Sequence, residues 1–277
     1  MTYKIVSDST ANILTLEGVD FQSVPLKIRV EDKEYVDNEN VSVTEMVTHL
    51  KRIKTKSTTA CPSPDEYIEA FGDADRIFCT TISSGLSGSY NSARLAKEEY
   101  ESKFPDRRVF VVDSLSAGPG VGIIVEKLEE LITSGKEYEE ICDIISEYAN
   151  NTHILFSLES LKNFANNGRV NPAIAKIIGV LGIRLVGTAT ETGTLDPTDK
   201  CRGEKNAIET VYKNMISRDY KGGKVIISHT ENPNAVQILK NKITESFPDA
   251  EVKITTNRAL CSFYAEPGGF LVSFEKN

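Results

Sequence analysis

The chain has 277 residues, of which 40% are hydrophobic and 26% are charged, and its formal net charge is −8 at pH 7. This length is sufficient for two domains, because single hydrophobic cores stop growing at about 250–300 residues. The acidic balance, without a stripe of clustered cations, excludes a nucleic-acid-binding protein. The five scattered cysteines and three separated histidines fit reduced thiols, and fit neither a disulfide framework nor a zinc site.

The first residues, MTYKIVSDST, contain neither the basic flank nor the apolar core of a signal peptide. No apolar stretch of the sequence approaches the length that is needed to span a membrane. We therefore expect no transmembrane segment and a cytoplasmic location.

The first half of the chain alternates between short apolar runs and amphipathic segments. The predicted strands cover residues 4–7, 21–30, 77–79 and 108–112, and the predicted helices begin near residues 43, 64, 119 and 137, with a further helix-like segment that includes residues 93–96. Pro25 interrupts the second of these strands and indicates an edge or an irregular passage. Strands that alternate with helices predict a doubly wound parallel sheet for residues 1–155.

Three of these strands are followed by polar turns. The turns begin at Asp8, at the Ser- and Gly-rich segment Thr80–Ala93, and at Asp113–Ser116. Ligands of open α/β sheets bind at the carboxyl ends of the strands. We expect Asp8 to hold a neighbouring loop by accepting backbone N–H bonds. The Ser- and Gly-rich turn offers hydroxyls and the N–H groups of a following helix, which together suit a carboxylate or a phosphate.

A second hydroxyl-rich segment, KSTTACPSP, covers Lys56–Pro64. Ser63 and Glu66 have the spacing of a capping box, so Thr59 is expected in the loop that precedes a helix. Only one helix and one strand separate this loop from the Ser- and Gly-rich turn. Because parallel connections place such loops at the same sheet edge, we expect Thr59 and Ser84 to meet across one pocket.

From about residue 156 the pattern changes to a mixture of strands and helices. Residues 171–181 are expected to form a helix that is apolar nearly all round, which means burial or the wall of an apolar cavity. The other expected elements are a helix over 158–164, a hairpin around 191–193, a helix over 202–215, strands over 224–229, 252–255 and 270–274, and a helix from Asn232. We therefore predict a mixed α/β domain over residues 156–277.

Taken together, these segments resemble the DegV family of bacterial fatty-acid-binding proteins. The resemblance covers nearly the whole chain and rests on the motifs VSDSTANI, VPLKI, STTACPSP, ISSGLSGSYNSA, VVDSLSAG, LESLKNFANNGRV and YAEPGG. It implies two α/β domains around one long-chain fatty acid, with its tail in an apolar tunnel. It also implies a non-catalytic protein without a cofactor, which carries acyl chains to a fatty acid kinase or another lipid-metabolic partner.

The resemblance assigns the carboxylate of the fatty acid to the hydroxyls of Thr59 and Ser84, with Ser83 as a further contributor. The other implied neighbours of the head group are Cys61, Arg169 and Tyr264. Cys61 departs from the family pattern, since a glutamine is common at this position. Many kinase-linked members have a histidine before a Gly-Pro-Gly segment near the C-terminus, and this chain has YAEPG in those places. The chemistry agrees with the assignment, because neutral hydroxyls and N–H groups bind a carboxylate without a cation.

Two other functions stay open. Ser84 or Cys61 is the nucleophile in one alternative, a serine or cysteine hydrolase that acts on a small acyl substrate with His229 as its base. This alternative lacks a Gly-x-Ser-x-Gly elbow and an orienting acid. The other alternative, a binder of phosphorylated small molecules, lacks an acidic cluster for magnesium.

Overall fold

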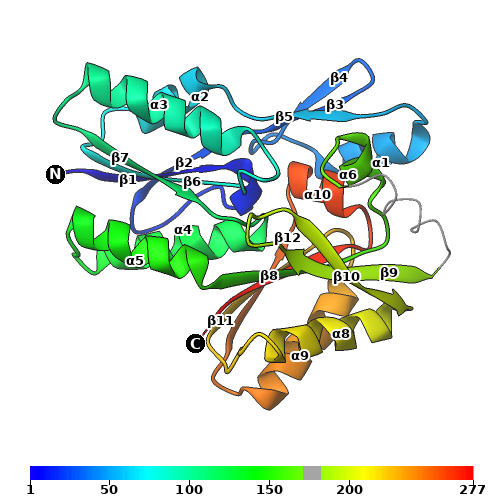
Figure 1. Cartoon of the computed structure of the whole chain (residues 1–277). Coiled ribbons are helices and arrows are strands. Elements are labelled where there is room, and N and C mark those ends of the chain that lie inside the picture. The colour runs from blue at the N-terminus through cyan, green and yellow to red at the C-terminus, as the bar shows by residue number, and fades with distance from the viewer. Residues whose placement is uncertain (171–181, 277) are drawn as a thin grey trace.

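The computed structural model describes residues 1–170 and 182–276. Within these residues the strands form a four-stranded sheet, a three-stranded sheet and a six-stranded sheet. Figure 1 shows the four-stranded sheet between two layers of helices, and the six-stranded sheet beside it with helices on its outer face. The prediction of a parallel sheet followed by a mixed sheet is therefore confirmed.

The four-stranded sheet is parallel, in the order β2-β1-β6-β7. Its strands are β1 (Tyr3–Asp8), β2 (Asp20–Val24), β6 (Arg76–Thr81) and β7 (Arg108–Asp113). Its helices are α2 (Pro64–Phe71) and α3 (Ser89–Lys103) on one face, and α4 (Pro119–Thr133) and α5 (Tyr138–Asn150) on the other. Alternate strand residues pack against opposite layers: Val6 lies with α2 and α3, whereas Ile5 lies with α4 and α5.

The three-stranded sheet differs from the sequence prediction. Its strands β3 (Lys27–Val30), β4 (Lys33–Val36) and β5 (Thr58–Ala60) are antiparallel, and α1 (Val43–Arg52) lies between β4 and β5 in sequence. The β-rich region expected over residues 21–30 forms two strands in different sheets, and the break between them lies at Pro25, where an irregular passage was predicted. The prediction that Thr59 lies in a loop of the parallel sheet is wrong, because Thr59 is in β5 and pairs with Ile28.

The six-stranded sheet has the order β10-β9-β8-β13-β11-β12, and only β11 and β12 are parallel neighbours. Its strands are β8 (Thr152–Leu158), β9 (Ile183–Ala189), β10 (Leu195–Arg202), β11 (Lys224–His229), β12 (Glu251–Thr256) and β13 (Phe270–Glu275). The helices α8 (Glu204–Ile216) and α9 (Pro233–Ser246) cover its outer face. Because β8 begins at Thr152, this sheet starts within the range expected for the N-terminal domain, and the exact division at residue 155 stays a prediction.

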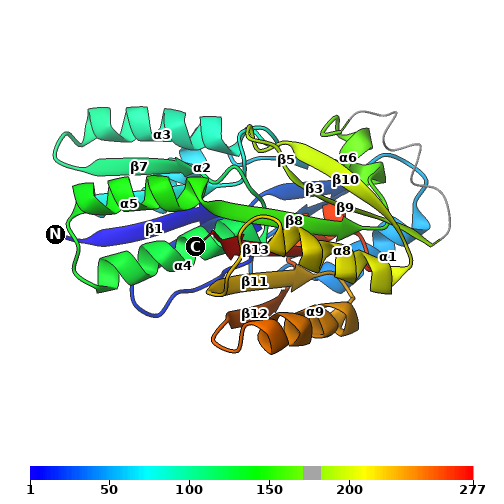
Figure 2. The ribbon, with the colours of Figure 1, turned by 60° about the horizontal axis from the view of Figure 1, so that its bottom comes forward.

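Helix α4 connects the two large sheets. Figure 2 shows it between the parallel sheet and strands β13 and β11. Ile226 of β11 belongs to the same buried cluster as Ile123 and Ile124 of α4. Lys224 of β11 forms ion pairs of 2.9 Å with Glu126 and with Glu130 of that helix. The two sheets are therefore packed through α4 as one body rather than joined by a free linker.

Several smaller elements differ from the sequence prediction. The helix expected over 158–164 is instead the end of β8 followed by α6 (Lys162–Asn166), and the predicted helix 171–181 lies outside the described residues. The short helices η1 (Ser9–Ala11) and α10 (Ala259–Ala265) were not predicted.

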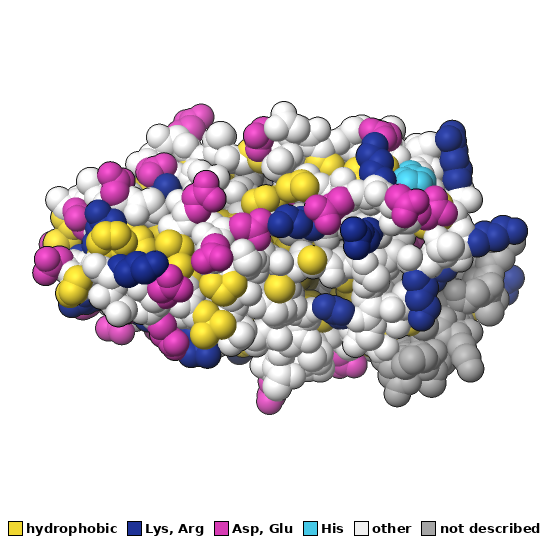
Figure 3. All heavy atoms as spheres, turned by 90° about the horizontal axis from the view of Figure 1, so that it is seen from above, with side chains coloured by type: hydrophobic (Ala, Val, Ile, Leu, Met, Phe, Trp, Pro, Cys, Tyr) yellow, Lys and Arg dark blue, Asp and Glu magenta, His cyan; other side chains and the backbone are white. Residues whose placement is uncertain are grey.

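The described helices, over residues 1–170 and 182–276, are too short or too polar to cross a bilayer. Figure 3 shows acidic and basic side chains interspersed over the face seen from above.

Candidate functional site

A cavity of about 280 Å³ lies where the three sheets meet. The parallel sheet contributes residues that follow its strand ends, namely Thr10 after β1, Ile82 after β6 and Ser116 after β7. The small sheet contributes Thr59 of β5, and Leu26 lies just before β3. The carboxyl ends of the parallel strands thus border the cavity, as expected for an open α/β sheet.

The six-stranded sheet forms an apolar wall of the cavity. Ile154, Phe156 and Leu158 of β8 all line it, whereas Leu155 packs with the helices on the opposite face. This alternation follows from the two-residue period of a strand. Leu271 of the neighbouring β13 also lines the cavity. At roughly 3.3 Å per residue, the side chains from Ile154 to Leu158 extend the wall over about 13 Å.

Helix α10 forms another wall, with Leu260, Cys261, Tyr264 and Ala265 in the lining. Its N-terminus is held by Asp37, which follows β4 and is fully buried. The Asp37 carboxylate accepts hydrogen bonds from the backbone N–H of Ala259 (3.0 Å) and of Leu260 (3.1 Å). Burial raises the pKa of the Asp37 carboxyl, and the charge of Arg258 opposes this rise.

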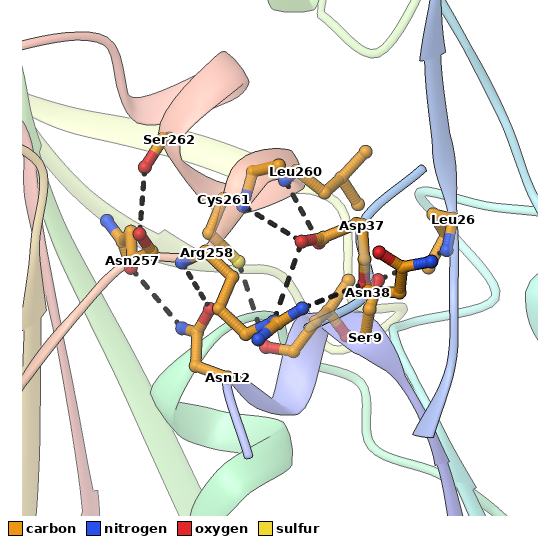
Figure 4. Close-up of polar contacts among 12 residues, drawn as sticks. Ser9, Asn12, Leu26, Asp37, Asn38, Asn257, Arg258, Leu260, Cys261 and Ser262 are labelled. Carbon is orange, nitrogen blue, oxygen red and sulfur yellow. Dashed lines mark hydrogen bonds and ion pairs between the residues drawn. The ribbon is translucent and has the colours of Figure 1, made fainter. Parts of the chain in front are cut away.

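Figure 4 shows how the rest of this network attaches α10 to the N-terminal part of the chain. Arg258 donates from Nη2 to the Asp37 carbonyl oxygen (3.0 Å), and its backbone N–H donates to Asn12 Oδ1 (2.9 Å). Asn12 in turn donates to Asn257 Oδ1 (3.3 Å). The position of α10, and of the side chains that it directs into the cavity, therefore depends on residues far away in the sequence.

Most polar side chains expected at the head group lie at one end of the cavity. Thr59 Oγ1 and the Tyr264 hydroxyl are 2.9 Å apart, and either can be the donor. Tyr264 packs on Phe164, with 4.7 Å between the ring centroids. Burial raises the pKa of Tyr264, while the bond with Thr59 and the charge of Arg169 lower it in part. Arg169 Nε donates to the Leu86 carbonyl oxygen (3.0 Å), which fixes the guanidinium beside this end.

Cys61 and the start of α3 complete this polar end. A Cβ atom at position 88 would lie 3.1 Å from Cys61 Sγ, so the thiol is in contact with Gly88, the N-cap of α3. Ser87 also lines the cavity, and its Oγ accepts a hydrogen bond from the Ser89 N–H (3.2 Å). No acceptor for the Ser87 hydroxyl proton lies among the described residues, so this proton is available to a ligand. The N-terminus of this 15-residue helix adds a partial positive charge.

The two serines predicted to bind the carboxylate, Ser83 and Ser84, lie outside the cavity lining. Ser84 is exposed, and its N–H donates to Asp113 Oδ1 (3.1 Å). Ser83 is fully buried, and its Oγ accepts from the Gly85 N–H (3.1 Å). Neither residue lines the cavity, whereas Thr59, Cys61, Arg169 and Tyr264 do. Carboxylate binding by Ser83 and Ser84 therefore stays a prediction without support from the cavity geometry.

Sequence reasoning missed Ser87 as a candidate ligand-binding residue. It belongs to the Ser- and Gly-rich turn and comes directly before Gly88, the N-cap of α3. Hydroxyls beside a helix start lie close to the free N–H groups of its first turn. This position relative to the helix start was a usable signal, and it separates Ser87 from the earlier serines of the turn.

Asp8 holds the loops around the cavity, as the sequence analysis predicted. Its buried carboxylate accepts hydrogen bonds from the N–H groups of Thr10 (3.2 Å) and Ile82 (2.9 Å) and from Ser89 Oγ (2.7 Å). Burial raises the pKa of Asp8, and these donors oppose the rise. One side chain thus fixes Thr10, Ile82 and the start of α3 relative to each other.

The residues of the hydrolase alternative are not assembled around the cavity. His229 is buried at the end of β11, and its Nδ1 accepts a hydrogen bond from the Asn232 N–H (3.1 Å). None of the three histidines lines the cavity. Over residues 1–170 and 182–276, no cluster of three His, Cys, Asp or Glu side chains is arranged to hold a metal ion.

The fold and this site define a class of protein in which an α/β fold encloses a largely apolar cavity, with hydroxyls and an arginine at one end. The chain belongs to the DegV family, since the family model described as "Uncharacterised protein, DegV family" matches residues 2–277. A DegV domain-containing protein of Streptococcus pneumoniae is 41% identical over 99% of both chains.

Solved structures with bound lipids are similar over the whole length. The Streptococcus pneumoniae fatty acid kinase B3 protein, loaded with linoleic acid, is 41% identical, with a TM-score of 0.98 and full coverage of both chains. A DegV family protein from Eubacterium eligens, loaded with heptadecanoic acid, is 39% identical, with a TM-score of 0.97 and full coverage of both chains.

Proposed function

We propose that this protein binds one long-chain fatty acid, with its carboxylate at the Thr59–Tyr264 end of the cavity and its tail along β8. The observation that carries this proposal is the distribution of polarity in the cavity. Apolar side chains form most of the wall, whereas Thr59, Tyr264, Cys61 and Arg169 gather at one end. The bound fatty acids of the two similar structures support the same ligand class.

Thr59, Tyr264 and Ser87 supply the hydroxyl donors for the carboxylate in this proposal. Each hydrogen bond to a charged group contributes about 1.5–3 kcal/mol. The N-terminus of α3 and the Arg169 guanidinium add positive potential at the same end. These groups fix the direction of the ligand and prevent an unpaired buried charge.

The tail supplies most of the affinity. Burial of each methylene group contributes about 0.8 kcal/mol, so about fifteen methylenes outweigh the head-group bonds even after the cost of ordering the chain is subtracted. The apolar residues of β8 and β13 provide the surface for this burial.

The protein is a non-catalytic cytoplasmic carrier in this proposal, and it delivers the acyl chain to a fatty acid kinase or to another lipid-metabolic partner. Full-length similarity to the fatty acid kinase B3 protein supports this partner class. The hydrolase alternative needs a base beside Cys61 or Ser84. None of the three histidines lines the cavity, and this favours the carrier.

The first test is the lipid content of the purified protein, measured by native mass spectrometry and by lipid extraction. A stoichiometric long-chain fatty acid supports the carrier. An empty protein that hydrolyses a model ester supports the hydrolase and contradicts the carrier.

The head-group assignment is tested by two matched double variants. Thr59→Val with Ser87→Ala is expected to weaken fatty acid binding about a hundredfold or more, because two hydrogen bonds to the carboxylate are lost. Thr59→Val with Ser84→Ala is expected to weaken binding no more than Thr59→Val alone. A larger effect of the Ser84 substitution would favour the original prediction over Ser87, and unchanged binding in both variants would contradict this head-group site.

A further inference from the structure

The three hydroxyls of the proposed head-group site come from parts of the chain that are far apart in sequence. Thr59 lies in β5, Ser87 lies in the turn before α3, and Tyr264 lies in α10. One carboxylate can bond with all three only if these elements are held in place together, because hydrogen bonds need donor–acceptor distances of about 2.5–3.2 Å. The site therefore depends on contacts that join β5, the turn and α10.

Asn163 of α6 bonds to the backbone directly beside Tyr264. Its Nδ2 donates to the Phe263 carbonyl oxygen (2.7 Å). In a continuous helix this carbonyl would accept from the residue four positions later, but that residue is Pro267, which has no N–H group. Phe164 of the same helix packs on the Tyr264 ring. Asn163 therefore supplies the donor that the end of α10 lacks, and it fixes the backbone that carries Tyr264.

Asn167, at the end of α6, bonds to the backbone near Thr59. Its Nδ2 donates to the Ser57 carbonyl oxygen (3.2 Å) and to the Asn163 carbonyl oxygen (2.9 Å). Ser57 lies just outside the pairing of β5 with β3, which begins at Thr58. The Asn167 amide therefore joins the start of β5 to α6, two residues before Thr59.

The turn after α6 reaches the third element. The N–H groups of Gly168 and Arg169 donate to carbonyl oxygens of α6 at 3.1 Å and 2.8 Å, and Gly168 has a φ of 72°. These bonds form a Schellman motif, whose left-handed position suits a glycine. The motif directs the chain toward the Ser- and Gly-rich turn, where Arg169 Nε donates to the carbonyl oxygen of Leu86, directly before Ser87. Residues 163–169 thus bond beside all three hydroxyls.

Figures 1 and 2 show α6 beside α10. Asn163 and Asn167 do not line the cavity, so they act on a ligand there only through the residues that they hold. We propose that residues 163–169 assemble the carboxylate site, and that Asn163 and Asn167 are positioning residues that act through Tyr264 and Thr59. The inference rests on the proposed binding of fatty acids and adds residues that this binding requires without touching the ligand.

Double-mutant cycles test this assignment on the delipidated full-length protein, with stearate affinity measured by displacement of a fluorescent fatty acid. Asn163→Ala is expected to weaken stearate binding about three- to tenfold in the wild-type background and less than about twofold in Tyr264→Phe, because the hydroxyl that it positions is then absent. A general loss of stability would lower affinity by the same factor in both backgrounds. Asn206→Ala is the matched control, since Asn206 Nδ2 donates to the Arg202 carbonyl oxygen (2.7 Å) near the start of α8, outside the cavity lining.

A second cycle pairs Asn167→Ala with Thr59→Val, and the same pattern of fold-changes is expected. This cycle decides the question where chemical denaturation shows that Asn163→Ala is unfolded under the assay conditions. Equal fold-changes in the two backgrounds of both cycles would overturn the inference, while stearate binding to the wild-type protein would still support the proposed function. Absence of stearate binding to the wild-type protein would overturn both.

Discussion

The parallel sheet and the six-stranded sheet border the same cavity in different ways. The parallel sheet presents the ends of its strands, so its contributions are loop residues such as Thr10, Ile82 and Ser116. The six-stranded sheet presents a face, so its contributions are alternate side chains of β8, Ile154, Phe156 and Leu158. Strand ends carry free backbone groups and polar side chains, whereas a sheet face carries apolar ones.

This difference separates two tasks within one site. The loops at the strand ends are held by hydrogen bonds to Asp8, and in the proposed function this part of the molecule sets the orientation of the ligand. In the same proposal the face of β8 contributes contact area and so sets affinity. Substitutions in the two regions should therefore have different signatures, and the following four predictions test that separation.

The largest effect is expected from Asp8→Ala at the strand ends. The substitution leaves the Thr10 N–H, the Ile82 N–H and the Ser89 hydroxyl without their acceptor, and the expected loss in the free energy of unfolding is about 3–5 kcal/mol. Chemical denaturation measures this loss. Asp106→Ala, at an exposed aspartate, is the control and should change stability by less than about 0.5 kcal/mol. A loss of less than about 1 kcal/mol in Asp8→Ala would show that other groups hold the loops.

A smaller loss of stability is expected from Leu158→Ala on the sheet face. The expected decrease in the free energy of unfolding is about 2–3 kcal/mol, because one side of Leu158 already borders empty space. Fatty acid affinity should fall in the same variant, since contact area along the tail is lost. Leu95→Ala, at a leucine that is 41% exposed on α3, should change neither quantity. Unchanged affinity in Leu158→Ala would place the tail elsewhere.

Tyr264→Phe tests orientation without a large change in packing. It removes one hydroxyl at the head-group end and is expected to weaken fatty acid binding by about 1.5–3 kcal/mol, or roughly ten- to a hundredfold, with little change in stability. Tyr212→Phe is the control, because its hydroxyl bonds with Ser246 on the outer face of the other sheet. The affinity for a fatty alcohol of equal length should differ less between Tyr264→Phe and the wild-type protein than the affinity for the acid does.

The smallest effect is expected in the pH dependence of stability, and it depends on His229. His229 is the last residue of β11, as Asp8 is the last residue of β1. Burial lowers the pKa of His229 below its ordinary value, so the folded protein favours the neutral imidazole. Its contribution to stability is present above about pH 6.5 and is lost as the pH falls through the lowered pKa. The wild-type protein should lose stability relative to His229→Asn between about pH 7 and about pH 5. Parallel pH profiles of the two proteins would contradict this expectation.

The sequence was most informative at the strand ends of the parallel sheet. Asp8 stands at the end of the first predicted strand, and its role in holding loops could be predicted because no second carboxylate or histidine lies nearby in the sequence. Thr59 was expected at the cavity as part of a loop of the parallel sheet. It does line the cavity, but it lies in β5 of a separate antiparallel sheet. The sequence could not show which serine of the Ser- and Gly-rich turn lines the cavity, because this depends on how the turn folds. Ser87 lines the cavity and Ser84 does not.

Other parts of the site left no local signal. The alternation of Ile154, Phe156 and Leu158 is the same whether these side chains face a cavity or a filled core. Helix α10 was missed because it is short and its N-terminal cap is not adjacent in sequence. The cap is supplied by Asp37, which is 222 residues away from Ala259. Such a contact becomes visible only in the folded chain.

This distant cap has a consequence for the order in which the protein forms during translation. The ribosome releases the N-terminal sheet first, and Asp37 is then present for most of synthesis without the helix that it caps. Only after α10 itself emerges can it dock on Asp37 and close this wall of the cavity. A lipid that meets the chain before that moment would find a cavity that is open on this side.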